Sequence, residues 1–141
     1  MNDEKPKAAP VAGIILTTLT ILLIAGIASL AGPCATHGDG DVPSCYWASR
    51  AILGIGVVIA IISIVRIFET DEGERRGLSL AAGLLGALVA VLPGWLIGLC
   101  ADGSMQCNAV MRPFALCLGA AIFLVGAVDL TRRLFAIAHR K

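Results

Sequence analysis

The sequence predicts an all-α integral membrane protein, a four-helix bundle built from two tandem helical hairpins. Hydrophobic residues make up 57% and charged residues 15% of the 141 positions, far from the averages of soluble domains. The mean hydropathy is correspondingly high, at +0.87. The apolar residues gather into four runs, and each run is close to the ~20 residues that a helix needs to cross a hydrocarbon core.

The four expected spans carry no charged side chain near their middle. They comprise residues 11–31, 48–68, 77–99 and 114–130. Arg66 and Asp129 lie close to the ends of the second and fourth spans, where a charged side chain can snorkel to the interface or find a local partner. We therefore expect both to be interfacial anchors. The length of the first span and the acidic Asp3 and Glu4 before it favour an uncleaved helix over a signal peptide.

The basic residues predict the orientation. Nine of the eleven Lys and Arg residues lie in the two tails and in the linker between the second and third spans with its flank; Arg50 and Arg112 are the other two. The positive-inside rule then makes both termini cytoplasmic. The chain divides into a cytoplasmic tail 1–10, a first hairpin 11–68 with outward loop 33–47, a cytoplasmic linker 69–76, a second hairpin 77–130 with outward loop 101–113, and a basic cytoplasmic tail 131–141.

The two outward loops have a common pattern, which predicts an internal repeat. "GPCATHGDGDVPSCYWASR" and "GLCADGSMQCNAVMR" both read Gly-x-Cys, a variable stretch, Cys, four residues and Arg. The two hairpins would then be parallel repeats related by an axis along the membrane normal. In this alignment the residues Cys34, Cys45 and Arg50 correspond to Cys100, Cys107 and Arg112.

Small residues recur four positions apart in the third span, a spacing that lets membrane helices approach closely. Pro93 followed by Gly94 predicts a bend there. We expect the bilayer and another membrane protein as partners, and a homo-oligomer stays open. At a net charge of +1, nucleic acid is excluded as a partner. The candidate partner-facing residues are Gly83, Gly86, Gly94, Gly98, Arg112 and Trp47.

The loop cysteines have three interpretations. In an oxidising compartment, disulfides Cys34–Cys45 and Cys100–Cys107 would close short loops and stabilise each hairpin by about 2–3 kcal/mol. A soft metal site is the second interpretation, with His37 and Met105 added to the four cysteines. The ten and six residues between the paired cysteines argue against structural zinc, whose cysteines lie closer together.

Thiol exchange is the third interpretation. Four spans, cytoplasmic termini and a cysteine pair in each outward loop resemble the layout of membrane disulfide oxidoreductases of the DsbB type. That resemblance implies a redox role for Cys34, Cys45, Cys100 and Cys107, with Arg50 serving a quinone cofactor. The sequence departs from that family because it has no Cys-x-x-Cys and its second loop is short.

A further resemblance covers the chain from the first span to the last. Outward loops of the form Cys...Cys-x-Trp and Gly-x-Cys...Cys, with Arg-Pro before the last span, resemble an uncharacterised family of small bacterial four-helix membrane proteins that are often encoded beside MacB-type ABC permeases. The resemblance implies a non-catalytic accessory subunit of such a transporter in the cytoplasmic membrane. No other catalytic or cofactor motif is present, so we expect no enzyme activity and no cofactor. The matching residues are Cys34, Cys45, Trp47, Gly98, Cys100, Cys107, Arg112 and Pro113.

Overall fold

Four long helices form the part of the chain that the computed structural model describes, residues 8–30, 44–99 and 106–138. All four are long and apolar enough to cross a membrane, so the predicted fold class is confirmed. Short π-helical turns, η1 and η2, follow α3 and precede α4. The elements are α1 (Ala8–Ser29), α2 (Ser44–Phe68), α3 (Glu72–Val91), η1 (Leu92–Leu96), η2 (Cys107–Met111) and α4 (Arg112–Ala138).

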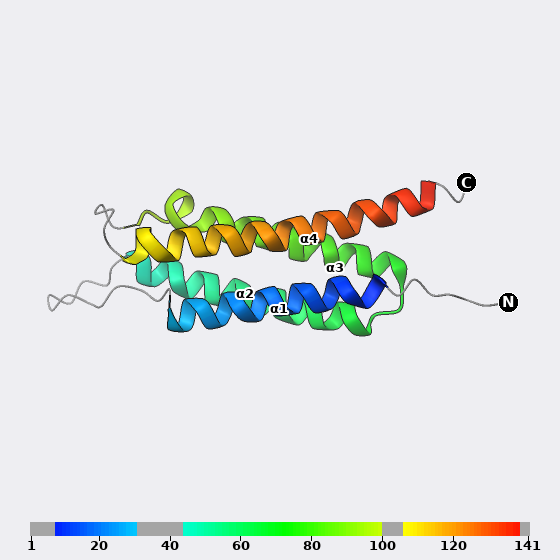
Figure 1. Cartoon of the computed structure of the whole chain (residues 1–141), viewed down its shortest axis with the longest axis horizontal. Helices are drawn as coiled ribbons and strands as arrows, with labels where there is room; N and C mark the ends of the chain where they lie inside the picture. The colour runs from blue at the N-terminus through cyan, green and yellow to red at the C-terminus, as the bar shows by residue number, and fades with distance from the viewer. Residues whose placement is uncertain (1–7, 31–43, 100–105, 139–141) are drawn as a thin grey trace, which may run out of the picture.

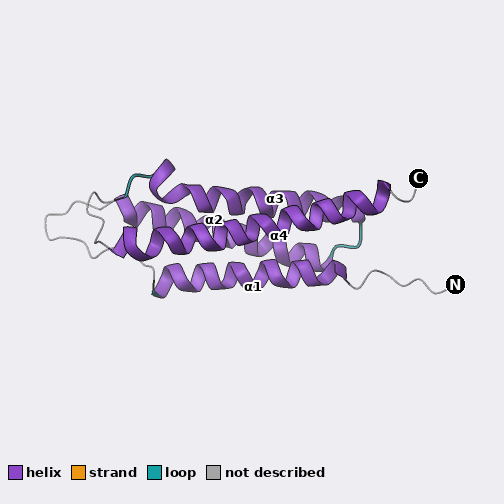
Figure 2. Cartoon of the chain, turned by 45° about the horizontal axis from the view of Figure 1, so that its top comes forward, coloured by secondary structure: helices purple, strands orange, loops and turns teal. Residues whose placement is uncertain are grey.

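Helices that follow each other in the chain are neighbours in the bundle. The most extensive contacts join α1 to α2 and α3 to α4, and weaker contacts of α2 with α3 and of α1 with α4 close the ring. Figures 1 and 2 show the four helices lying along one axis. We call the end with Ala8, residues 69–71 and Ala138 the linker end, and the opposite end, with Cys45 and Cys107, the cysteine end.

Several helices extend beyond the expected spans. α3 already begins at Glu72, inside the stretch expected to be linker, because Asp71 caps it. The Asp71 carboxylate accepts hydrogen bonds from the backbone N–H groups of Gly73 at 2.7 Å and Glu74 at 3.3 Å. Such a cap satisfies amides that have no partner within the helix. At the other end of the chain, α4 continues through the basic tail to Ala138.

The α3–α4 contact depends on glycine at positions where the two backbones nearly touch. A Cβ atom on Gly119 would lie 2.7 Å from both the Ala90 nitrogen and the Gly86 oxygen. One on Gly126 would lie 2.8 Å from the Ser79 oxygen. Since lipid gives no hydrophobic drive between helices, such close backbone packing contributes strongly to the association of membrane helices.

α3 breaks at the point where the sequence predicts a bend. Its regular part ends at Val91, and Pro93 and Gly94 leave helical geometry, with Gly94 at φ +95°. The turn is closed by two backbone hydrogen bonds of 3.0 Å, from the Gly94 N–H to the Ile97 oxygen and from the Ile97 N–H to the Leu92 oxygen. The expected bend is therefore confirmed, and it is a complete interruption of the helix.

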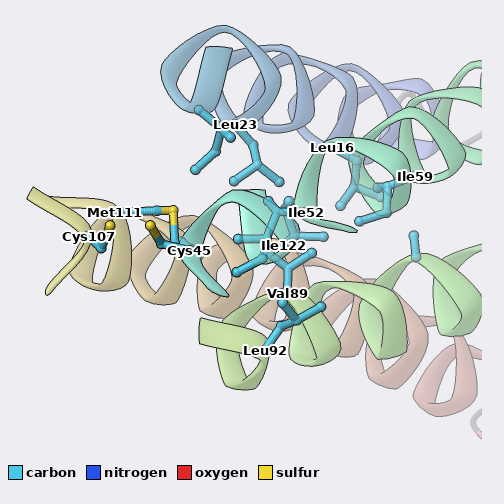
Figure 3. Packing of buried hydrophobic residues seen from close by; sticks show 14 residues of the cluster. Leu16, Leu23, Cys45, Ile52, Ile59, Val89, Leu92, Cys107, Met111 and Ile122 are labelled. Carbon is cyan, nitrogen blue, oxygen red and sulfur yellow. The ribbon is translucent and has the colours of Figure 1, made fainter. Parts of the chain in front are cut away.

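The packed interior runs along the whole bundle. Its buried residues recur at intervals of three, four or seven positions on each helix, as a helix with one inward face requires. Figure 3 shows part of this core from the side, with the cysteine end at the left. Side chains from all four helices point toward the middle of the bundle. The labelled members of the core include Leu16, Leu23, Ile52, Ile59, Val89 and Ile122.

Candidate functional site

A charged cluster lies inside the bundle near the linker end. The Arg66 guanidinium on α2 donates from Nη2 to Asp129 Oδ2 of α4 at 2.7 Å, which is also an ion pair. Its Nε donates to the Ser79 hydroxyl of α3 at 2.7 Å. The same hydroxyl lies 2.8 Å from Asp129 Oδ2. Three helices therefore meet in one hydrogen-bonded triangle.

The triangle corrects one of our expectations about the two charges. The Arg66 side chain is 0% exposed and that of Asp129 is 11% exposed, so Arg66 does not snorkel to the interface. The two residues are instead each other's local partner. An isolated charge in a membrane interior is costly, and pairing with an opposite charge through direct hydrogen bonds offsets that cost. Burial of Arg66 is possible because Asp129 enters the bundle beside it.

Space for the guanidinium comes from a glycine on α1. A Cβ atom on Gly13 would lie 3.1 Å from Arg66 Nη1, so a larger residue there would crowd the charge. Arg66 Nη1 and the Ser63 hydroxyl are both buried and have no hydrogen-bond partner among the residues that the structure describes. The cluster thus satisfies most, but not all, of its polar atoms from within the bundle.

The turn between α2 and α3 is held by its own hydrogen bonds at the linker end. The backbone N–H groups of Asp71, at 3.1 Å, and Thr70, at 2.9 Å, donate to Glu69 Oε1. Because these bonds favour the ionised carboxylate, they lower the pKa of Glu69 below its ordinary value. Arg75 donates to the Glu69 carbonyl oxygen from the following turn. The linker is therefore a defined turn of three residues rather than a flexible tether.

The second cysteine of each loop lies at the cysteine end of the core. Cys45 on α2 and Cys107 on η2 are fully buried, and Figure 3 shows them next to each other with Met111. Cys34, Cys100, His37 and Met105 lie outside the described residues. The two disulfides and the soft metal set therefore stay predictions. Within the described ranges, no group of three His, Cys, Asp or Glu residues is placed to hold a metal ion.

Arg50, the residue expected to serve a quinone in the redox interpretation, lies against an aromatic ring. Its Nε donates to the Tyr46 hydroxyl at 3.2 Å, and its Cζ lies 5.2 Å from the centre of the Tyr46 ring. The distance suits a cation–π interaction, in which Arg50 is exposed and Tyr46 is half-buried near the start of α2. Arg50 thus has a partner within its own helix.

The structure divides the expected partner-facing residues into two groups. Gly83 and Gly86 are buried against α4, where a Cβ on Gly86 would come within 2.7 Å of Ile122 Cγ2. They are used inside the bundle. The other four expected residues are exposed at the cysteine end. Among them, Arg112 lies over Gly94, because its Nε is 3.2 Å from the position that a Cβ atom on Gly94 would take. These four are Trp47, Gly94, Gly98 and Arg112.

Sequence reasoning missed three functional positions. Ser79 was not singled out, and only the positions of Arg66 and Asp129 on neighbouring helices show its polar role. Gly119 and Gly126, seven residues apart on α4, were not singled out. Their spacing is two helical turns, the signal of a glycine face, and it could have identified them.

These features define a polytopic helical membrane protein with a buried intramembrane ion pair. The chain belongs to the family of a domain of unknown function, DUF4418, whose profile matches residues 14–132. The match covers nearly the whole chain, as expected of a member of an uncharacterised family. No curated protein and no solved structure is detectably similar to the chain.

Proposed function

We propose that the protein is a non-catalytic accessory subunit that binds another membrane protein, an ABC transporter permease, at the cysteine end. In this proposal it lies in the bacterial cytoplasmic membrane with both termini inside and the cysteine loops outside. Two disulfides, Cys34–Cys45 and Cys100–Cys107, make the outer loops rigid. The basic residues of the tails and linker support this orientation.

The observation that carries the proposal is the exposure of large side chains at the cysteine end. The Trp47 side chain on α2 is 61% exposed and that of Trp95 on η1 is 82% exposed. Arg112 is exposed at the start of α4, and no ion pair joins it to another described residue. Tryptophan and arginine are the residues most enriched in the energetic centres of protein interfaces.

These side chains are displayed on anchored turns. Cys45 precedes Trp47 by two residues and is fully buried, so the first turn of α2 is fixed to the core. Buried Cys107 holds η2 in the same way, five residues before Arg112. A site built on ordered elements loses little conformational entropy on binding, which favours a protein partner.

Site-specific photo-crosslinking in native membranes tests the proposal. A photoreactive phenylalanine analogue replaces Trp95, and as a matched control it replaces Phe68, an aromatic residue at the linker end that is 79% exposed. We expect an adduct with the permease from position 95 and none from position 68. Substituting Arg112 by Gln should weaken the adduct. A permease adduct from position 68 alone, or from neither position, would overturn the proposal.

A DsbB-like thiol-disulfide oxidoreductase with a quinone cofactor is the second candidate function. The observation that favours it is the meeting of Cys45 and Cys107 in one buried cluster, since electron transfer between two cysteine pairs requires that they approach each other. Thiol labelling across graded glutathione potentials separates the candidates. Structural disulfides stay oxidised at all glutathione potentials above about −300 mV. A catalytic cysteine pair instead changes between its oxidised and reduced forms near about −120 to −200 mV. Soft-metal handling ranks third and predicts stoichiometric co-purified metal.

A further inference from the structure

We infer that the linker-end half of the α3–α4 face binds one anionic phospholipid, with the phosphate at Arg76 and an acyl chain in the groove beyond it. This site lies away from the cysteine end and does not depend on the proposed permease. Three observations carry the inference: a groove between the two helices, an uncompensated arginine at its end, and the register that aligns them.

The groove is a shallow apolar cavity of about 70 Å³ between α3 and α4. It is far smaller than the ~300 Å³ and more of pockets that enclose small-molecule ligands, so it suits a narrow chain. Gly83 and Gly126 lie in the wall of the cavity where the two helices approach most closely, and their neighbours include exposed apolar side chains. The lining includes Leu80, Gly83, Leu84, Phe123, Gly126 and Leu130.

Arg76 lies one helical turn from the groove on the same face of α3. Residues 76, 80 and 84 are four apart, so they follow one another along the helix, about 6 Å per step. A guanidinium at 76 therefore stands at the headgroup end of a path that continues past Leu80 and Leu84. Along α3, the charge of Arg76 is followed by the apolar groove, and in a phospholipid the phosphate is likewise followed by the acyl chains.

The charge on Arg76 lacks a counter-charge in the described part of the chain. Its Nε is buried and has no hydrogen-bond partner there. The neighbouring arginines are already engaged, because Arg66 pairs with Asp129 and Arg75 bonds the Glu69 carbonyl oxygen and lies 3.9 Å from Glu72. A guanidinium without a counter-charge offers planar donors that match a phosphate group. Anionic lipids are enriched in the cytoplasmic leaflet, and the inference rests on the proposed orientation, which puts the linker end on that side.

Quenching of tryptophan by brominated phospholipids measures this binding on the full chain. In a background with Trp47→Phe and Trp95→Phe, Leu84→Trp places the reporter on the groove wall. Ile21→Trp is the control, because α1 and α3 both begin at the linker end and residue 21 lies at a similar depth. Their exposed fractions also match, at 59% for Leu84 and 56% for Ile21. The vesicles contain phosphatidylcholine and a minor fraction of brominated phosphatidylglycerol.

Quenching of the Leu84→Trp reporter should correspond to a binding constant about fivefold higher for phosphatidylglycerol than for phosphatidylcholine. This is the factor expected for one arginine near an anionic headgroup. The Ile21 reporter should follow the bulk composition. Arg76→Gln should abolish the preference, while Arg132→Gln, at an exposed position on α4 outside the groove lining, should leave it unchanged. Native mass spectrometry of protein without reporters should show retained phosphatidylglycerol in the wild type and less in Arg76→Gln.

Two results would overturn the inference. One is equal preference at both reporters, which would mean that the anionic lipid is attracted by the bundle as a whole. The other is protection of the Leu84 reporter from both lipids together with dimer formation, which would assign the groove to a helix of a second copy. Circular dichroism of each variant verifies that the bundle is folded, so loss of the preference in Arg76→Gln is attributable to the charge.

Discussion

Removing one member of the buried ion pair should destabilise the bundle far more than removing both. Asp129→Leu leaves the Arg66 guanidinium, 0% exposed, without its counter-charge. Breaking a buried pair in this way costs about 3–5 kcal/mol. Arg66→Met should cost less, because Asp129 is 11% exposed and keeps the Ser79 hydroxyl as a hydrogen-bond donor at 2.8 Å.

The double variant Arg66→Met/Asp129→Leu tests the electrostatic argument. Replacing a buried ion pair by apolar residues of similar volume is often neutral or stabilising, so we expect the double variant to lie within about 1 kcal/mol of the wild type. The coupling energy of the cycle would then be several kcal/mol, well above the threshold for independent sites. The Ser79 hydroxyl keeps the Arg75 carbonyl oxygen as an acceptor, at 2.9 Å.

Reversible unfolding in mixed anionic and nonionic micelles, followed by far-ultraviolet circular dichroism, gives the free energies for the four proteins of the cycle. The reasoning fails if Asp129→Leu lowers the free energy of unfolding by less than about 1 kcal/mol, since a fully buried guanidinium without a counter-charge should destabilise the bundle by more than that. It also fails if the double variant loses the sum of the two single losses. That additivity would mean that the residues act separately and that their contact is incidental.

Three further outcomes follow from the packing and the cysteines. Gly119→Ala should cost about 1–3 kcal/mol because its Cβ would lie 2.7 Å from two backbone atoms of α3, whereas Gly83→Ala, with its nearest atoms at 3.7 Å, should change the unfolding free energy little. Gly94→Ala should cost about 1–2 kcal/mol, measured in the same micelles, because φ is +95° there. If both loop disulfides form, denatured but unreduced protein should be labelled by a thiol reagent at Cys117 alone. Labelling at any further cysteine would contradict the disulfides.

The sequence was sufficient for the number of spans, because apolar length and the absence of central charges are local properties. The break at Pro93 and Gly94 was predictable for the same reason. The Arg66–Asp129 pair was not, because it depends on how α2 and α4 are rotated within the ring. In a membrane helix every face is apolar, so hydrophobic periodicity does not report that rotation. Gly86 was expected to face a partner for this reason, and it faces α4 instead.

The buried ion pair also has a consequence for how the chain is made. Arg66 and Asp129 are separated by 63 positions, so at about 5–20 residues per second the arginine is synthesised roughly 3–13 s before its counter-charge. During that interval Arg66 lacks the partner that it has in the finished bundle. The residue stands close enough to the end of α2 to keep its guanidinium at the lipid headgroups. We expect it to enter the bundle only when α4 arrives, so that insertion of the last helix completes the packing of the first hairpin.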